Sequence, residues 1–347
     1  MNKSGLYKIV RIRKIKEEVK SFKTFVLEEG HNIHYKSGQY LTLVHYLHSE
    51  EVRRSYSITS APVLNEPLSF GVKRVENGFF SRQLIDYAKP GDEILTIGSG
   101  GFFVLPEDIE NYQQLFFFAA GSGITPVYSL VKEALYVHPH ISLVLIYSNA
   151  SAEKTVFLKP LQELQELFPY RFHLEVLFSN SANLSKARLH RDLILQFTHQ
   201  LAVKEMATIL FYVCGPENYM RLCTYTLQEH GILTANIKRE NFIIHTVTKR
   251  DASPPDREAH IAHIHIAGVT HKVTVRYPDS ILKAAKKEGL ALPYSCEAGR
   301  CGNCVAKCIK GKVWQSYNEV LTEKDFQKGF VLTCVGHPID GDVELEI

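Results

Sequence analysis

The sequence predicts a multidomain chain that combines β and α/β domains. Three observations predict this fold class: short strand-like segments through the first hundred residues, alternating strands and helices from about 112 to 240, and a cysteine-rich loop followed by further strands. A chain of 347 residues is long enough for two or three domains that each bury their own core. We expect domains at 1–108, 109–242 and 259–347, with a Pro-containing linker at 243–258.

The first domain is predicted to be an antiparallel β-barrel. Segments 7–15, 21–27, 39–45 and 54–59 have the pattern of short strands separated by turn residues. In the last of these, alternation places Arg54, Tyr56 and Ile58 on one face and hydroxyl side chains on the other. This segment alone could be no more than an amphipathic strand. Downstream, Gly78-Phe79-Phe80-Ser81 leads into a helix expected at 81–87, and such a helix start is a ready anion site. Together the two segments supply the parts needed to hold a flavin and its phosphates.

The second domain is predicted to be a doubly wound parallel α/β sheet. An apolar strand at 114–120 ends in Gly121-Ser122-Gly123-Ile124-Thr125-Pro126, and a helix with apolar residues at helical spacing follows. Glycines between a strand and a helix let backbone amides approach a pyrophosphate. Strands at 142–147, 173–178 and 208–213 alternate with helices at 160–168, 191–199 and 216–229. Cys214-Gly215-Pro216 also follows a strand, so both motifs are expected at the edge where such sheets bind ligands.

The third domain contains a cysteine motif typical of an iron–sulfur site. Cys296, Cys301 and Cys304 are separated by four and then two residues, and Cys334 follows later in the chain. This is the plant-type spacing for a [2Fe–2S] cluster. A zinc site usually has two separated C-x-x-C pairs, whereas this segment has one such pair. A bacterial [4Fe–4S] motif has two-residue gaps first and a final proline, whereas the first gap here is four residues. Cys308 is expected to be a small buried apolar side chain and not a ligand.

The rest of this domain is predicted to be a hairpin, a helix and further strands. The hairpin is expected at 260–266 and 271–276, and the helix at 281–288 with Asp279 or Ser280 as its N-cap. A last strand is expected at 343–347.

Bulk composition limits the kinds of partner. The formal net charge of +3 gives no indication of a nucleic-acid partner. Seven cysteines, with four assigned to a cluster, suit a reducing compartment better than a disulfide framework. The start of the chain has no apolar signal segment, and the apolar runs are too short to span a bilayer. We therefore expect a cytoplasmic protein without membrane insertion.

Taken together, the motifs resemble the ferredoxin–NADP+ reductase family, in the subgroup with a plant-type ferredoxin domain fused at the C-terminal end. Arg54-Ser55-Tyr56-Ser57-Ile58-Thr59 is similar to the family's flavin motif, and Gly78-Phe79-Phe80-Ser81 to its phosphate turn. The order of flavin, nucleotide and iron–sulfur domains most resembles reductases that serve phenylacetyl-CoA epoxidase and related oxygenases. The resemblance implies a β-grasp fold for the third domain.

The resemblance also implies roles for individual residues. Arg54 would neutralise a flavin phosphate, Tyr56 would pack on the isoalloxazine ring, and Ser57 would hydrogen-bond near the flavin atom that accepts hydride. Ser57 and Cys214 would form the hydride-transfer site. Cluster ligands would be Cys296, Cys301, Cys304 and Cys334. The other implied cofactor-binding residues are Ile58, Thr59, Lys73, Gly78, Phe79, Phe80, Ser81, Gly121, Ser122, Gly123, Ile124, Thr125, Pro126, Gly215 and Pro216.

One departure concerns the nucleotide. Relatives selective for NADPH usually have arginines after the second and third strands of the α/β domain, where this chain has Asn149-Ala150 and Ser179-Asn180. Lys154, Lys186 or Arg188 could supply the missing cation.

These parts predict a reductase that passes electrons from NAD(P)H through FAD and a [2Fe–2S] cluster to a protein acceptor, such as an oxygenase, epoxidase or desaturase. A flavin is needed between the nicotinamide and the cluster, because nicotinamide delivers two electrons together and the cluster accepts one at a time. Two alternatives are a redox-sensing flavin/[2Fe–2S] module and a reductase that acts directly on a small molecule.

Overall fold

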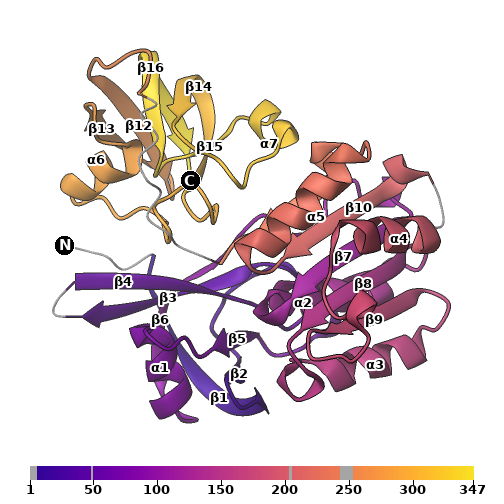
Figure 1. The fold of residues 1–347 in the computed structure, drawn as a ribbon. Coiled ribbons are helices and arrows are strands. Elements are labelled where there is room, and N and C mark those ends of the chain that lie inside the picture. Colours follow the sequence, from indigo (N-terminus) through magenta and orange to yellow (C-terminus); the bar gives the residue numbers. More distant parts are fainter. Residues whose placement is uncertain (1–5, 48–49, 203–204, 243–252) are drawn as a thin grey trace. The chain divides into compact units, whose positions relative to one another are not determined.

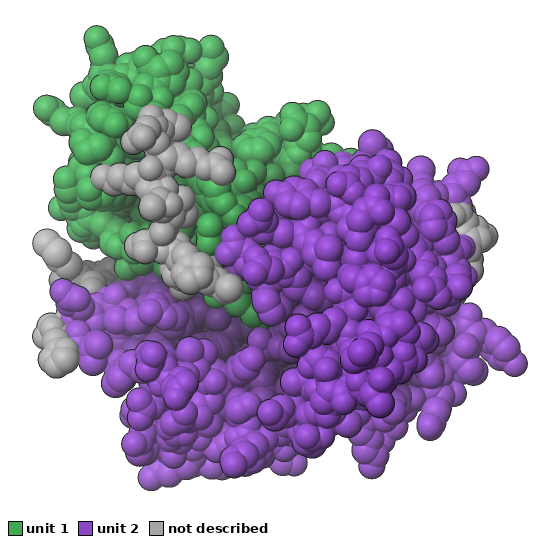
Figure 2. Space-filling view, viewed as in Figure 1, with its two compact units in different colours: residues 1–7, 100–102, 242–347 green, residues 8–99, 103–241 purple. Residues whose placement is uncertain are grey.

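The computed structural model describes residues 6–47, 50–202, 205–242 and 253–347, and the chain divides into two compact units (Figures 1 and 2). The larger unit contains residues 8–99 and 103–241, which include the predicted barrel and α/β domains. The smaller unit contains 1–7, 100–102 and 242–347, which include the cysteine motif. Of the predicted linker, residues 243–252 lie outside the described residues.

The first domain is built on a six-stranded sheet whose buried side chains alternate along the strands. Ile12, Phe25, Leu41 and Phe70 are fully buried in its core. Strand β1 pairs antiparallel with β2 and β6, β2 with β5, and β3 with β4. In order across the sheet the strands are β4 (Glu50–Ser57), β3 (Tyr40–Leu47), β6 (Glu93–Gly100), β1 (Lys8–Val19), β2 (Phe22–Leu27) and β5 (Ser69–Lys73).

The predicted barrel is not hydrogen-bonded all the way round. Strand β4 ends at Ser57, and beyond it Ile58 forms only an isolated bridge with Phe70 of β5. A 3₁₀ turn at Pro62–Leu64 follows, and proline has no N–H to extend a ladder. A short helix α1 (Phe79–Arg82) and a π-helical turn (Gln83–Tyr87) occupy the segment predicted as one helix.

The second domain confirms the predicted doubly wound parallel sheet. The central strand of this sheet, β7 (Gln114–Ala120), is buried along its whole length, as expected for a strand that is covered on both faces. Helices α2 and α3 pack on one face of the sheet, and α4 and α5 on the other (Figure 1). The strands in order are β11 (Ile237–Glu240), β10 (Ile209–Cys214), β7 (Gln114–Ala120), β8 (Ser142–Asn149) and β9 (Phe172–Phe178). The helices are α2 (Ile124–Val137), α3 (Leu158–Leu167), α4 (Arg191–Leu201) and α5 (Glu217–Glu229).

Polar contacts join the first two domains within the larger unit. The Gly38 amide donates to Ser129 Oγ on α2 over 2.9 Å. Lys132, also on α2, is 6 % exposed and forms an ion pair with Glu66 of the first domain. These contacts fix helix α2, which begins at the glycine motif, against the antiparallel sheet.

The smaller unit has the predicted β-grasp architecture. Strand β12 (His260–Ile266) pairs antiparallel with β13 (Val269–Val275) and parallel with β16 (Gly336–Glu346). Strand β14 (Val305–Gln315) pairs antiparallel with β16 and with β15 (Phe330–Leu332). Helix α6 (Ile281–Lys287) packs its apolar side chains on this sheet, and a second helix, α7 (Glu323–Gln327), follows β14. Of the two predicted N-caps, Ser280 is the one whose hydroxyl accepts from the Lys283 amide.

Among the helices of the described residues, none has the length and apolar character required to cross a bilayer.

Candidate functional site

The glycine motif and the Cys214-Gly215-Pro216 turn are packed against each other at the carboxyl edge of the parallel sheet. A Cβ at Gly123 would lie 2.2 Å from the Cys214 carbonyl oxygen, and a Cβ at Gly215 would lie 3.0 Å from the Ala120 Cβ. Only glycine at position 123 allows the two backbones to approach so closely. The turns after β7 and β10 therefore form one continuous surface.

Hydrogen bonds to its backbone carbonyls hold the glycine motif in shape. Gly121 has a positive φ of 54°, which favours glycine. Thr125 Oγ1 donates to the Ser122 carbonyl over 2.8 Å, and the Tyr147 hydroxyl donates to the Gly121 carbonyl over 3.1 Å. The side chains of Ile124, Thr125 and Pro126 are buried, so this segment presents mainly backbone. Pro126 lies in the first turn of α2, as predicted.

Three polar residues from distant parts of the chain meet beside this surface. Cys214 on β10 lies opposite Glu240 on the neighbouring strand β11. The Ser57 hydroxyl, at the end of β4, donates to Glu240 Oε2 over 3.5 Å. Burial raises the pKa of the Glu240 carboxyl to about 8, although the Ser57 hydrogen bond lowers it. Burial, and then the nearby Glu240, raise the pKa of the Cys214 thiol well above its ordinary value. At neutral pH this cluster is therefore largely uncharged and can hold a proton on Glu240.

Sequence reasoning missed Glu240. It lies on a four-residue strand with no clear periodicity, and only the parallel register with β10 places it opposite Cys214.

The two neighbouring arginines of β4 lie in different environments. Arg53 is 4 % exposed and pairs with Glu51 over 2.5 Å, whereas Arg54 is exposed and donates to the Arg53 carbonyl over 2.7 Å. Tyr56 is half-buried, with its ring centroid 6.2 Å from that of Phe70. Strand alternation therefore leaves Arg54 as the arginine that can reach a ligand.

The two residues after β4 face inward. Ile58 is fully buried in the sheet core, and Thr59 Oγ1 forms a hydrogen bond with Ser69 Oγ over 2.9 Å. Neither side chain is available to a cofactor at the surface.

The turn at 78–81 is closed by a serine hydroxyl. Ser81 Oγ accepts from the Val75 amide and donates to the Gly78 carbonyl, each over 3.1 Å. A Cβ at Gly78 would lie 2.7 Å from Ser81 Oγ, so glycine keeps this turn tight. Phe80 is buried and Phe79 is exposed.

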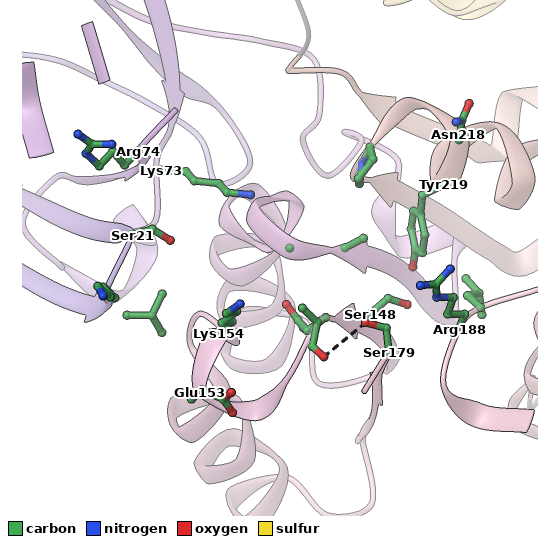
Figure 3. Close-up of a pocket in the computed structure, with 18 of the residues that line it drawn as sticks. Ser21, Lys73, Arg74, Ser148, Glu153, Lys154, Ser179, Arg188, Asn218 and Tyr219 are labelled. Carbon is green, nitrogen blue, oxygen red and sulfur yellow. Dashed lines mark hydrogen bonds between the residues drawn. The ribbon is translucent and has the colours of Figure 1, made fainter. Parts of the chain in front are cut away.

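A groove of about 1340 Å³ lies between the antiparallel and parallel sheets of the larger unit (Figure 3). It is larger than the roughly 300–1,000 Å³ of a typical small-ligand pocket. Gly121 and Pro216 of the two packed turns line it, together with Lys73 and Arg74 of the first domain. Six cations and three carboxylates line the groove: Lys20, Lys23, Lys73, Arg74, Lys154 and Arg188, and Glu17, Asp86 and Glu153. This excess of positive charge suits a ligand with several phosphates.

In the smaller unit, the four predicted thiols form two pairs. Cys304 Sγ lies 3.1 Å from Cys334 Sγ, and the thiols of Cys296 and Cys301 are hydrogen-bonded to each other. That hydrogen bond, followed by donation from backbone amides at 298, 300 and 301, lowers the pKa of Cys296 to about 6. The Cys308 thiol instead donates to the Lys310 carbonyl over 3.4 Å.

This pairing fits a two-iron cluster, in which each iron takes two thiolates. In the described part of the chain, no three His, Cys, Asp or Glu side chains gather as they would around a single metal ion. Gly299 has a φ of 70°, and a Cβ there would lie 2.9 Å from the Tyr317 carbonyl oxygen, so glycine is required in the loop.

Comparisons with protein families agree with these sites. Residues 7–104 match the model of an oxidoreductase FAD-binding domain, 117–224 that of an oxidoreductase NAD-binding domain, and 264–338 that of a 2Fe-2S iron-sulfur cluster binding domain. The fold and the site thus define an NAD(P)H-dependent flavin and iron–sulfur oxidoreductase.

Several known proteins are similar to this one over nearly the whole chain. The chain is 29 % identical to a component of the 1,2-phenylacetyl-CoA epoxidase of Escherichia coli, over 90 % of this chain and 88 % of that protein. It is 29 % identical to the ferredoxin reductase component of 3-ketosteroid-9-alpha-monooxygenase of Mycolicibacterium smegmatis, over 92 % and 91 %. The structure of phthalate dioxygenase reductase covers 98 % of both chains with a TM-score of 0.58 at 20 % identity, which supports the fold. The chain thus contains FAD-binding, NAD-binding and C-terminal 2Fe-2S domains, and over nearly its whole length it is similar to proteins of oxygenase and epoxidase systems.

Proposed function

We propose that this chain is the reductase component of an oxygenase system, and that it passes electrons from NAD(P)H through FAD and a [2Fe–2S] cluster to a partner oxygenase, epoxidase or desaturase. The names of its relatives support this assignment, because they include a component of an epoxidase and the reductase components of monooxygenases. Bound FAD supplies the step from two-electron to one-electron transfer.

The observation that carries the proposal is the meeting of Ser57, Cys214 and Glu240 in one cluster. Ser57 belongs to the FAD-binding domain, whereas Cys214 and Glu240 belong to the NAD-binding domain. A site built from both domains is what transfer between their ligands requires. We assign Ser57 and Cys214 to orienting the two reacting rings, and Glu240 to holding a proton next to Ser57.

The other residues would bind and position the ligands. Exposed Arg54 would neutralise a flavin phosphate, and Tyr56 would pack on the flavin ring. Lys73 and the tight turn from Gly78 to Ser81, with Phe79 and Phe80, would border the flavin. Backbone amides of the glycine motif, with Gly215 and Pro216, would hold the dinucleotide. Any contribution from Ile58 and Thr59 would come from their backbone, because both side chains are buried.

Cys296, Cys301, Cys304 and Cys334 would hold the cluster, and backbone amides around Cys296 would stabilise its charge. The domain boundaries proposed for this chain are 1–108, 109–242 and 259–347. The proposal places the protein in the cytoplasm, where a reducing environment keeps such thiols free for cluster assembly.

Turnover with a protein acceptor tests this function against the two alternatives. The purified holoprotein should oxidise NAD(P)H over many cycles under anaerobic conditions when cytochrome c is present as a one-electron acceptor. A sensing module would be reduced once and then stop. A direct small-molecule reductase would reduce cytochrome c equally well after Cys334→Ser, whereas the proposed route requires the cluster.

A further inference from the structure

We propose that Lys132 is a positioning residue for hydride transfer: its buried ion pair with Glu66 holds helix α2 against the FAD-binding domain, and through α2 it sets the placement of Cys214 relative to Ser57. The inference rests on the proposed function, because that function assigns Ser57 and Cys214 to orienting the two reacting rings. Lys132 itself is not among the residues that line the described groove.

One side of α2 contacts the FAD-binding domain at three points along the helix. Thr125, Ser129 and Lys132 are four and then three residues apart, so they lie on one face of α2. A Cβ at Gly71 of β5 would lie 2.8 Å from Thr125 Cγ2, and the Gly38 amide donates to Ser129 Oγ over 2.9 Å. Lys132 provides the third contact through its ion pair. Successive turns of α2 are therefore joined to the first domain.

The contact at Lys132 is the one that is most costly to break. Lys132 is 6 % exposed, and burial lowers the pKa of its ammonium. Such a cation needs an acceptor, because a buried charge without a partner is strongly destabilising. The Glu66 carboxylate accepts from the ammonium and also from the Ala61 amide over 2.8 Å, and the ammonium lies 4.6 Å from the centroid of the Tyr128 ring. Movement of α2 away from the first domain would separate this buried charge from its partner.

Aromatic packing continues the joint beside Tyr128. The Tyr128 ring stacks on Phe157 with centroids 4.5 Å apart, and Phe157 meets Phe22 of β2 edge-on at 5.9 Å. Phe22 belongs to the first domain but is buried in the apolar core of the second. Phe157 has a φ of 59°, which is unfavourable for a bulky side chain and persists only where packing holds it. Because packed interiors yield little, this joint transmits a displacement from one domain to the other.

Helix α2 connects the joint to the hydride-transfer site. It begins at Ile124, directly after Gly123, where a Cβ would lie 2.2 Å from the Cys214 carbonyl oxygen. Cys214 must therefore move with the start of α2. The Ser57 hydroxyl of the first domain reaches Glu240 beside Cys214 over 3.5 Å, which is long for a hydrogen bond. A small shift of α2 would break this contact, and misplacement by about 1 Å can lower a rate by roughly 10²-fold.

The test compares Lys132→Met with two control variants in the holoprotein. Lys132→Met keeps an unbranched side chain and removes the charge. Val131 precedes Lys132 on α2 and is fully buried in the apolar core of the second domain, so Val131→Ala destabilises the same helix and keeps the ion pair. Lys159→Met removes an exposed lysine that pairs with Glu163 over 3.8 Å, and it controls for lost charge. Urea unfolding measures the stability of each variant.

Anaerobic stopped-flow reduction of the flavin at several concentrations of NADPH, and separately of NADH, distinguishes nucleotide binding from hydride transfer. Lys132→Met should lower the limiting rate constant about tenfold and change the nucleotide Kd by less than about twofold, because the groove itself is unaltered. The charge-transfer absorbance of the nucleotide–flavin complex, which requires stacked rings, should weaken in the same variant. Lys132→Arg retains the cation and should recover most of the rate. Val131→Ala and Lys159→Met should stay within about twofold of the wild-type rate constant.

Hydrogen exchange provides a readout that does not depend on flavin reduction. The Gly38 amide, which donates to Ser129 on α2, should exchange faster in Lys132→Met than in Val131→Ala. Slower flavin reduction in Lys132→Met supports the role even if the wild type fails to reduce cytochrome c, a result that would refute only the electron route. A wild-type rate constant in Lys132→Met, or equal slowing in Lys132→Met and Val131→Ala, would overturn the positioning role. A wild-type flavin that neither NADPH nor NADH reduces would refute the proposed function and this role together.

Discussion

The cysteine loop and the Ser57–Cys214–Glu240 cluster each contain a thiol with a proposed role, and the surroundings of Cys296 and Cys214 shift the thiol pKa in opposite directions. At Cys296, the neighbouring thiol and backbone amides lower the pKa to about 6. At Cys214, burial and the nearby Glu240 carboxyl raise the pKa. In the cysteine loop the lowered pKa is confined to Cys296, because the neighbouring thiols raise the pKa values of Cys301 and Cys334. The other region suppresses charge beside the turns assigned to the nucleotide. Hydrogen-bond donors thus favour the thiolate at Cys296, and burial favours the neutral thiol at Cys214.

The two regions also differ in how the chain brings their groups together. Three of the four cluster cysteines lie within a single loop, and Cys334 follows β15 in the same sheet. The uncharged cluster instead takes Ser57, Cys214 and Glu240 from strands β4, β10 and β11, and its neighbouring surface depends on close backbone packing. Substitutions should therefore damage the first region by removing ligands and the second by disturbing packing or protonation.

The largest expected effect is on the cluster. Cys334→Ser removes one of the four thiolates and should abolish stable [2Fe–2S] binding. Cys308→Ser is the matched control and should retain the cluster, because the Cys308 thiol is bonded to a backbone carbonyl outside the two pairs. Iron and sulfide analysis with visible spectra distinguishes the variants, and cluster loss in Cys308→Ser alone would refute the ligand assignment.

Local spacing explains why the cluster could be predicted from the sequence while the other region was only partly predicted. Cysteine spacing fixes a loop, and the strand–glycine–helix pattern located the turn at Gly121 correctly. Glu240 was missed because its position beside Cys214 depends on the register of two parallel strands that are far apart in the chain. Tertiary packing likewise decides that the sheet stays open after Ser57, and that Arg53 is buried while Arg54 is exposed.

The next largest effect is expected from substitutions in the two packed turns, which follow β7 and β10. Gly123→Ala places a methyl group against a backbone carbonyl and should lower the free energy of unfolding of the larger unit by about 2–3 kcal/mol, as for overpacked sites. Gly215→Ala adds the same methyl group but meets its nearest neighbour, a side-chain carbon, only at 3.0 Å, so it should cost less than about 1 kcal/mol. Urea unfolding of both variants checks this order, which an equal loss in the two would contradict.

Flavin affinity tests the exposed arginine of β4. Arg54→Ala should weaken FAD binding about tenfold, because it removes a charge-assisted contact to phosphate. Arg13→Ala removes another exposed arginine of the same sheet and should leave FAD affinity unchanged. Fluorescence titration of the flavin-depleted variants gives both values, and full retention of FAD affinity by Arg54→Ala would rule out this role.

The last prediction concerns the protonation of Glu240, whose effect is spread over several pH units. Its pKa is raised from about 4.5 to about 8 by burial, so the folded chain binds a proton that the unfolded chain has released across this range. Stability should therefore fall as pH rises from about 4.5 to 8, by at most about 1.4 kcal/mol per pH unit from this group. Glu240→Gln should remove that part of the slope. Urea unfolding at several pH values tests it, and a slope unchanged by the substitution would show that Glu240 does not keep its proton in this pH range.

Anaerobic stopped-flow reduction by NADPH tests the central claim, that electrons pass through FAD to the cluster, most directly. Flavin and cluster absorbance are followed separately in the wild type and in Cys334→Ser, and cytochrome c reduction is measured in parallel. The account predicts that the flavin is reduced first and the cluster afterwards in the wild type. In Cys334→Ser, flavin reduction should proceed at a similar rate while cytochrome c reduction is largely lost. Cluster reduction that precedes flavin reduction, or full cytochrome c reduction without the cluster, would contradict it.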